Sequence, residues 1–321
     1  KTMKKVLFAT TALIATAGFA SADVSLSGSA EMGISGGDAS TAVTQFHQDI
    51  EVTFKLSGAT ENGLNFGAAI DLDEAGTSGA GTDVADDDGV AIFISGAMGT
   101  LTMGDTDGGF DWAMAEVPTG SGSIADNESS HSGWNGNSGL DGTHDGQILR
   151  YNHTVGGLGF AVSVELDDTS GATQADSIIG VGFKYSVGDL GIGVGYQTGE
   201  DTGAAPRADL TVTGFSLAYS MGDYSMGANY SQKDISTDAD EETHMAVGVS
   251  YSMDALTLGA NYGQYDNAGY VAGADRAGYG FSAGYDLGGG AKALFGYETT
   301  SKHETKTSED STWSLGLSMS F

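Results

Sequence analysis

The 321-residue sequence contains no cysteine and only two prolines, and its 12 basic residues stand against 43 acidic ones. Without cysteine, the protein has neither disulfide bonds nor thiolate chemistry. A formal net charge of −31 argues against nucleic acid and anionic membrane surfaces as partners, and it favours cations near the protein. The 52 glycines follow no collagen-like period, so they fit strands and tight turns instead.

Long apolar runs are also lacking, except for residues 6–19, which follow a short basic stretch. This run ends before the small residues 20–22, which are typical of a cleavage site. A run of about 14 residues is too short for a transmembrane helix, which needs roughly 20. We therefore interpret residues 1–22 as a secretory signal peptide, with residues 1–2 upstream of its start, and residues 23–321 as one domain.

Tyrosine recurs at intervals of 34, 34, 32 and 34 residues from the middle of the chain onward. Each of these tyrosines comes just before a short turn and another run of alternating apolar residues. A period near 34 can indicate helical repeats, but residues within each unit alternate by two rather than by about 3.6. The repeat is therefore interpreted as a β-hairpin. The tyrosines are Tyr151, Tyr185, Tyr219, Tyr251 and Tyr285.

Sixteen strand-like runs can be counted after residue 22. Seven short and eight longer connections alternate between them, as in an up-and-down sheet with turns on one side and loops on the other. The runs lie near 24–34, 46–57, 63–73, 89–96, 99–105, 147–155, 158–167, 177–187, 189–198, 207–220, 222–231, 243–253, 255–263, 277–287, 290–299 and 311–321.

The apolar faces of these strands decide which solvent surrounds them. In residues 190–197, apolar side chains alternate with glycine and glutamine, and residues 50–56 alternate in the same way. A soluble barrel would have to pack such faces against one another, but sixteen strands enclose too wide a space. A lipid bilayer removes this conflict, because apolar faces can point outward while glycine, serine and charged faces line water.

The sequence therefore predicts an all-β fold, namely a 16-stranded antiparallel transmembrane β-barrel with short periplasmic turns and long external loops. The last strand would close the barrel, with Trp313 and Phe321 facing lipid. The tyrosines near the short turns suit an interfacial aromatic girdle. The alternative is an exported acidic β-rich adhesin with a sandwich or solenoid fold, although the calcium-binding GGxGxD repeat is absent.

Two short matches raise the question of catalysis. Residues 33–37 and 280–284 both fit the pattern G-x-S-x-G. A nucleophile elbow needs a strand-to-helix turn, whereas Ser282 is expected in the middle of a strand. The histidines form no HExxH motif. We therefore expect no enzymatic activity.

Four segments carry a family resemblance: MKKVLFATTALIATAGFASADVSLSGSAEMGI (3–34), VTFKLSGATENGLNFGAAIDLDEAG (52–76), ISGAMGTLTMGD (94–105) and YGFSAGYDLGGGAKALFGYE (279–298). They resemble the general diffusion porins of Rhodobacter-type α-proteobacteria, over essentially the whole chain. The resemblance implies a homotrimer in the outer membrane that passes small hydrophilic solutes passively. It also implies that the third long loop folds into the lumen, and that assembly machinery reads the terminal aromatic Phe321. A substrate-specific channel or a structural barrel is the alternative within this class.

The third loop, residues 106–146, is the longest connection and contains no lysine or arginine. Residues 108–117 could form a short helix, and the bulky Phe110, Trp112 and Met114 could dock the loop. The resemblance makes this loop the pore constriction, where a ring of acids favours cations. The alternative is a solvated external loop. The candidate constriction residues are Asp105, Asp107, Asp111, Glu116, Asp126 and Glu128.

Charged residues on the polar faces of strands would line the lumen wall. Opposed acids and bases would set a field across the pore. Related pores carry an arginine cluster facing the loop, whereas residues 46–55 offer only His47 and Lys55, beside Asp49 and Glu51. This departure weakens the expected field and favours cations. The candidate wall residues are Glu51, Lys55, Arg150, Lys184 and Lys292.

The second loop is dense in carboxylates, which are the ligands that Ca²⁺ prefers. No EF-hand spacing is present, and an exposed acidic loop is the alternative. No cofactor is required, but related porins hold calcium, so calcium stays a candidate ligand. In related trimers this loop also reaches a neighbouring subunit. The candidate ligands are Asp83, Asp86, Asp87 and Asp88.

Overall fold

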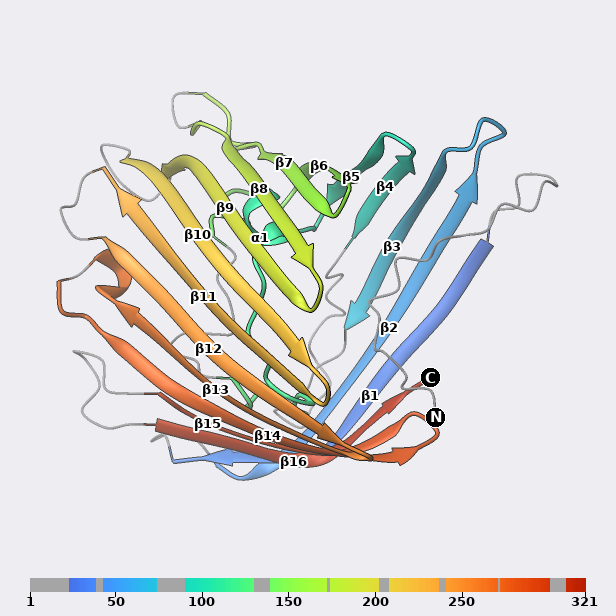
Figure 1. The fold of residues 1–321 in the computed structure, drawn as a ribbon, viewed down its shortest axis with the longest axis vertical. Helices are drawn as coiled ribbons and strands as arrows, with labels where there is room; N and C mark the ends of the chain where they lie inside the picture. The colour runs from blue at the N-terminus through green and yellow to red at the C-terminus, as the bar shows by residue number, and fades with distance from the viewer. Residues whose placement is uncertain are drawn as a thin grey trace.

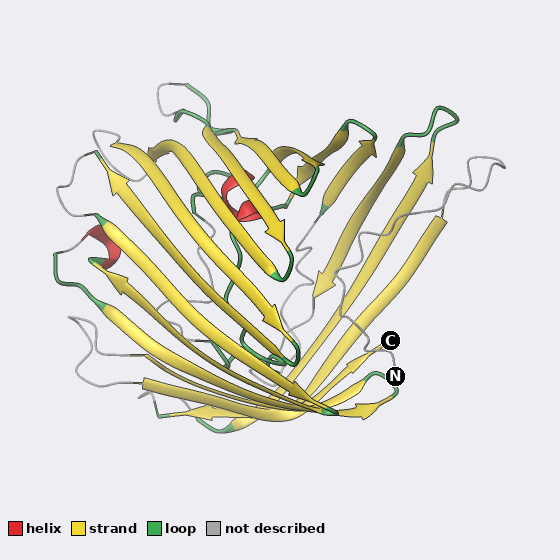
Figure 2. Ribbon diagram, viewed as in Figure 1, coloured by secondary structure: helices red, strands yellow, loops and turns green. Residues whose placement is uncertain are grey.

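In the residues that the computed structural model describes, sixteen antiparallel strands pair with their sequence neighbours around a closed barrel. Figures 1 and 2 show the strands tilted around an interior that holds a short helix. Closure into one barrel confirms the predicted fold and contradicts the sandwich and solenoid alternatives. The described residues are 23–38, 43–73, 90–129, 139–171, 174–201, 208–236, 241–270, 272–300 and 310–321.

The strands lie within four residues of the runs read from the sequence. They are β1 (Asp23–Gly37), β2 (Gln45–Ala59), β3 (Asn65–Asp73), β4 (Ala91–Gly96), β5 (Gly99–Gly104), β6 (Ile148–Val155), β7 (Leu158–Glu165), β8 (Ile178–Val187), β9 (Leu190–Asp201), β10 (Ala208–Met221), β11 (Tyr224–Ile235), β12 (Glu242–Met253), β13 (Leu256–Asp266), β14 (Arg276–Gly288), β15 (Ala291–Thr300) and β16 (Asp310–Ser320). In the part of the chain that the structure describes, two short helices accompany them, α1 (Gly109–Ala113) and η1 (Ala268–Tyr270).

Tight turns close the hairpins at one end of the barrel. Between β6 and β7, Gly156 and Gly157 have φ angles of 58° and 86°. Two successive residues with positive φ make a turn whose twist matches that of the flanking strands. Asp254 takes a φ of 51° in the turn between β12 and β13, where aspartate tolerates the left-handed region. The predicted alternation of short and long connections is thereby confirmed.

The barrel is apolar outside and polar inside. On β8, Ile179, Phe183 and Val187 are exposed, whereas on the inner wall Gln197 of β9 and Ser216 of β10 are fully buried. Alternate residues of each strand therefore point their apolar side chains outward, as a bilayer requires. Among the described residues, no helix is long and apolar enough to cross a membrane.

The wall of the barrel differs in height around its circumference. β4 and β5 have 6 residues each, whereas β10 has 14 and β1 has 15. At about 3.4 Å per residue and a tilt of about 40°, these strands rise by about 15 Å at β4 and about 37 Å at β10. The apolar band of an outer-membrane barrel is about 25 Å tall, so the wall at β4 and β5 is too low to cover it.

Candidate functional site

The described parts of the third loop, residues 106–129 and 139–146, lie along the inner wall of the barrel, and the α1 helix is enclosed by the strands in Figure 1. Polar side chains of successive strands bind its backbone. The Oγ atoms of Ser163 and Ser216 accept hydrogen bonds from the Gly109 and Ala115 N–H groups at 2.7 and 2.8 Å. Further along, Ser282 Oγ donates to the Thr119 carbonyl at 2.5 Å, and Asn261 Nδ2 donates to the Glu128 carbonyl at 2.6 Å.

Inward-facing glycines, which we call the glycine belt, make room for the loop. A Cβ atom at Gly182 would clash with the Gly109 carbonyl oxygen, and one at Gly259 would clash with the Thr119 carbonyl oxygen. The prediction that the glycine faces line water is therefore wrong at this level, because the loop covers them. The belt comprises Gly182, Gly193, Gly195, Gly214, Gly227, Gly248, Gly259, Gly280, Gly296, Gly316 and Gly33.

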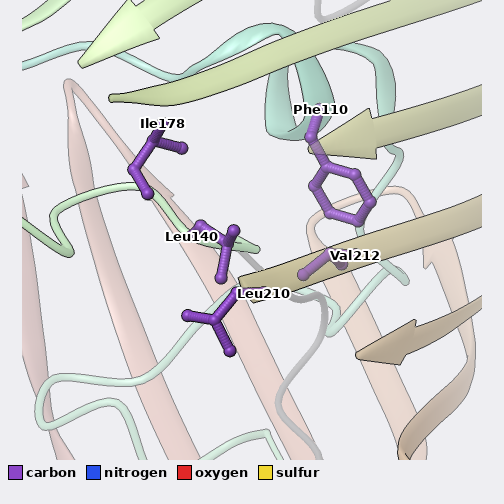
Figure 3. Close-up of a cluster of buried hydrophobic side chains, with 5 residues drawn as sticks. All are labelled: Phe110, Leu140, Ile178, Leu210 and Val212. Carbon is purple, nitrogen blue, oxygen red and sulfur yellow. The ribbon is translucent and has the colours of Figure 1, made fainter. Parts of the chain in front are cut away.

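An apolar cluster inside the barrel fixes the start and the end of the loop (Figure 3). Phe110 of α1 is 0% exposed and packs with Leu140 at the end of the loop. The strands contribute Ile178, Leu210 and Val212, and Met114 packs at the edge. The predicted docking through Phe110 and Met114 is confirmed. The strand residues were missed, although apolar residues at inward positions 208, 210 and 212 of β10 break the expected alternation.

Two basic residues of the barrel wall bind the third loop. Arg150 Nη1 of β6 donates to the Asp107 carbonyl at 2.6 Å and lies 3.6 Å from the Asp107 carboxylate. Lys184 Nζ of β8 donates to the Trp112 carbonyl at 2.9 Å and lies 3.6 Å from the centre of the Trp112 ring. The prediction that these two residues face the loop across the lumen is therefore wrong, because both contact it directly.

Acidic residues gather around α1. Burial, followed by the charges of Asp107, Asp141 and Glu116, raises the pKa of Asp111 to about 7, although Arg150 opposes this shift. Burial also raises the pKa of Glu116, and Asp107 adds to the effect. Deprotonated carboxylates in this group repel one another, and together with burial this repulsion keeps part of the Asp111 population protonated near pH 7.

Asp141 and Glu165 hold the returning part of the loop, and neither was among the predicted constriction or wall residues. Asp141 accepts hydrogen bonds from Gly108 N at 2.6 Å and from Gln197 Nε2 at 2.5 Å, while burial raises its pKa to about 6. The buried Glu165 carboxylate of β7 accepts three backbone N–H bonds, at 2.9–3.1 Å. Their donors are Gly142, His144 and Gly146.

The other predicted constriction acids lie in two different places. Asp105 stands at the loop entrance, where its N–H donates to the Val90 carbonyl at 2.9 Å. Asp126 and Glu128 lie near the end of the first described stretch of the loop, 106–129, in a turn that contacts β14 to β16. Glu128 accepts a hydrogen bond from Ser123 Oγ at 2.6 Å, and burial raises its pKa. The six candidates thus do not form one ring.

The inner wall of β1 to β3 is rich in acids. In the strand register, Glu31 is opposite Asp49, and Glu51 is opposite Asp73. Cross-strand partners share a face of the sheet, so these carboxylates stand on the inner wall, together with Asp71. Glu51 accepts a hydrogen bond from Ser29 Oγ at 3.1 Å. Of the predicted basic wall residues, Lys55 is opposite Ala69 and Lys292 is opposite Ser318, and both are exposed.

Ser282 lies in the middle of β14 and donates a hydrogen bond to the third loop, so this G-x-S-x-G match forms no nucleophile elbow.

The last strand closes the barrel as predicted. Trp313 is opposite Gly36 of β1, and the backbone N–H of Phe321 donates to the Gly28 carbonyl at 2.9 Å. Phe321 is 81% exposed.

Some predicted features lie outside the described residues. These are the signal peptide at 1–22 and the candidate calcium ligands Asp83, Asp86, Asp87 and Asp88. Within the described ranges, no group of three or more histidine or carboxylate side chains is placed to hold a metal ion.

A closed sixteen-stranded barrel with an apolar outside and a loop along its inner wall has the architecture of an outer-membrane channel. A family model described as Gram-negative porin matches residues 9–307, and the chain therefore belongs to the Gram-negative porins. At this level it is an outer-membrane channel for diffusion, and its family and fold are those of channels rather than enzymes.

Solved porin structures share the fold. A porin refined at 1.8 Å is 21% identical, with 93% of this chain and 100% of that chain covered and a TM-score of 0.69. A triple mutant of Rhodopseudomonas blastica porin is 19% identical at the same coverage, with a TM-score of 0.65. An anion-selective porin from Comamonas acidovorans is 12% identical over 94% of this chain and 100% of that chain, with a TM-score of 0.69. A comparison with curated proteins found no match.

Proposed function

We propose that the protein is a general diffusion porin of the Rhodobacter type that prefers cations and passes small hydrophilic solutes. The observation that carries this proposal is the excess of carboxylates on the inner wall of β1 to β3, which adds to those of the third loop. In a narrow pore with low-dielectric walls, one sign of charge is focused into the path and raises the local concentration of counter-ions.

The basic residues support the same sign of selectivity. Arg150 and Lys184 are bound to the third loop, so their charges are directed at its backbone and at Asp107. Lys55 and Lys292 are exposed on the wall and are outnumbered by the carboxylates of β1 to β3. The anion-selective porin from Comamonas acidovorans shares the fold, so selectivity must depend on such side chains rather than on the barrel itself.

A homotrimer is proposed from the low wall at β4 and β5. A wall of about 15 Å leaves part of the bilayer's apolar thickness uncovered. A neighbouring subunit placed against this side would cover it. The resemblance further supports export through residues 1–22, assembly that reads Phe321, and calcium at Asp83, Asp86, Asp87 and Asp88, with no cofactor required for diffusion.

Single-channel recording in a planar bilayer tests the proposal. With a KCl gradient across the membrane, we expect stepwise openings grouped in threes. The reversal potential should have the sign that indicates higher permeability to potassium than to chloride. An anion-favouring reversal potential would overturn the selectivity. Single, ungrouped openings would count against the trimer, and the lack of any conductance from folded, inserted protein would indicate a structural barrel.

A further inference from the structure

The pairing of β1 with β16, which we call the seam, closes the barrel between strands at opposite ends of the domain. Its register runs from Ser29 opposite Ser320 to Gly37 opposite Thr312. Because this pairing joins the most distant strands in the sequence, it carries the largest loop-closure entropy of any strand pair in the barrel. Contacts that bridge the seam therefore bear directly on whether the barrel stays closed.

One side chain of the third loop sits directly on this seam. Ile124 is 2% exposed, although it lies in a loop. Gly33 of β1 and Gly316 of β16 are opposite one another, and a Cβ atom added at either position would clash with Ile124 Cδ1. The paired glycines thus form a notch that spans both strands, and Ile124 fills it.

A hydrogen bond fastens the turn that holds Ile124 to β16, and a second bond continues from β16 to β15. Asn127 Nδ2 donates to Thr312 Oγ1 of β16 at 2.6 Å, and Thr312 Oγ1 donates to Glu298 Oε1 of β15 at 2.5 Å. Ser123 Oγ accepts from Asn127 N at 2.7 Å and donates to Glu128 at 2.6 Å, which closes the turn. We call residues 123–128 the seam clasp.

The other end of the loop is fixed on the far part of the wall, at Arg150, Ser163 and Lys184 of β6 to β8. The loop therefore joins these strands to the seam through the inside of the barrel. We propose that the seam clasp holds β1 and β16 together, so that inward folding of the third loop and closure of the barrel are one cooperative step. This role is independent of which solutes the pore passes.

The alternative is that the loop stabilises the whole wall evenly, without a special role at the seam. A matched pair of variants separates the two. Ile124→Ala empties the notch at the seam, whereas Val117→Ala removes a similarly buried side chain that packs on Gly248 of β12, beside β11. Amide hydrogen exchange of the folded protein in detergent then reports the opening of each strand pair.

For Ile124→Ala, we expect exchange of β1 and β16 amides to accelerate about tenfold or more, with β11 and β12 unchanged, because a buried cavity weakens the contacts around it. Val117→Ala should act on β11 and β12 instead. Equal acceleration in all strands for both variants would overturn the proposal. If Ile124→Ala does not fold, Ile124→Val and Asn127→Ala provide milder changes to the same contacts.

A cross-link provides an independent test, because the chain has no cysteine of its own. Ile34 and Leu315 are opposite one another across the seam, so Ile34→Cys and Leu315→Cys can be joined by oxidation. In the oxidised barrel, we expect Ile124→Ala to lose its effect on the unfolding rate in SDS, while the reduced barrel keeps it. An effect of equal size in both forms would show that the clasp does not act through the seam.

Discussion

Asp111 shows how a single side chain in this loop is made sensitive to pH. It lies in α1 among three other carboxylates, and burial raises its pKa to about 7. The folded protein therefore binds a proton at Asp111 that the unfolded chain has released, across the range from about pH 4 to about pH 7. A carboxyl group whose pKa is raised in the folded state stabilises the fold at pH values below that range. This contribution to the free energy of unfolding is lost as the pH rises through 7.

We predict that Asp111→Asn removes its own share of this dependence, while Glu116, Glu128 and Asp141, whose pKa values burial also raises, keep theirs. The wild-type protein should resist unfolding in SDS better at pH 5 than at pH 8, and the difference should shrink in the variant. The measurement is the midpoint temperature of unfolding at the two pH values. Asp189→Asn, at an exposed turn between β8 and β9, is the control and should keep the wild-type difference. A full pH difference in Asp111→Asn would contradict this account.

The sequence was sufficient to place Asp111 and Glu116 in an acidic loop, since that depends only on composition and loop length. It was insufficient to pair Arg150 with Asp107 or Lys184 with Trp112. Those contacts depend on the course of the loop inside the barrel, and alternation along a strand predicts which side chains face inward but not what covers them.

The glycine belt is the feature that sets this course at the level of whole elements. One inward glycine after another, from β8 around to β1, leaves space for backbone rather than for side chains. Glycine inside a strand often marks the close approach of another backbone. The glycines at alternate positions of 191–195 and of 180–182 therefore indicated that another backbone approaches these strands. The sequence analysis instead predicted that the glycine faces line water.

We predict that Gly182→Ala displaces α1 from the wall. Its Cβ would meet the Gly109 carbonyl oxygen, and overpacking of this kind costs about 1–3 kcal/mol. The unfolding temperature should fall, and single-channel conductance should change because the helix moves into the lumen. Gly191→Ala is the matched control on β9, since its Cβ lies 3.7 Å from Ala218 and fits without movement. Equal effects of the two variants would show that the close approach at Gly182 is unimportant.

For the molecule as a whole, the barrel itself was the most predictable part. The strand period, the hairpin turns and the alternation of loop lengths are local patterns in the sequence, and a barrel in a bilayer accounts for all three. The distribution of charge around the lumen was less predictable. Strand register was needed to bring Asp71 and Asp73 of β3 beside Glu51 of β2, and residues 20 and 22 positions apart in the sequence thereby become one acidic surface.

We predict that the acidic wall contributes to selectivity through screened electrostatics. In the double variant Asp49→Asn and Glu51→Gln, the potassium-over-chloride permeability ratio should fall, because two wall charges are removed without change in volume. The fall should be larger at 0.1 M than at 1 M salt, since the screening length shrinks from about 10 Å to about 3 Å. Reversal potentials in KCl gradients measure the ratio.

Asp209→Asn on the exposed end of β10 serves as the control and should leave the ratio unchanged. If the double variant has wild-type selectivity at both salt concentrations, the wall of β1 to β3 lies outside the path of the ions. The third loop would then have to set the selectivity alone, and Asp107, the exposed carboxylate beside Arg150, would be the next group to neutralise.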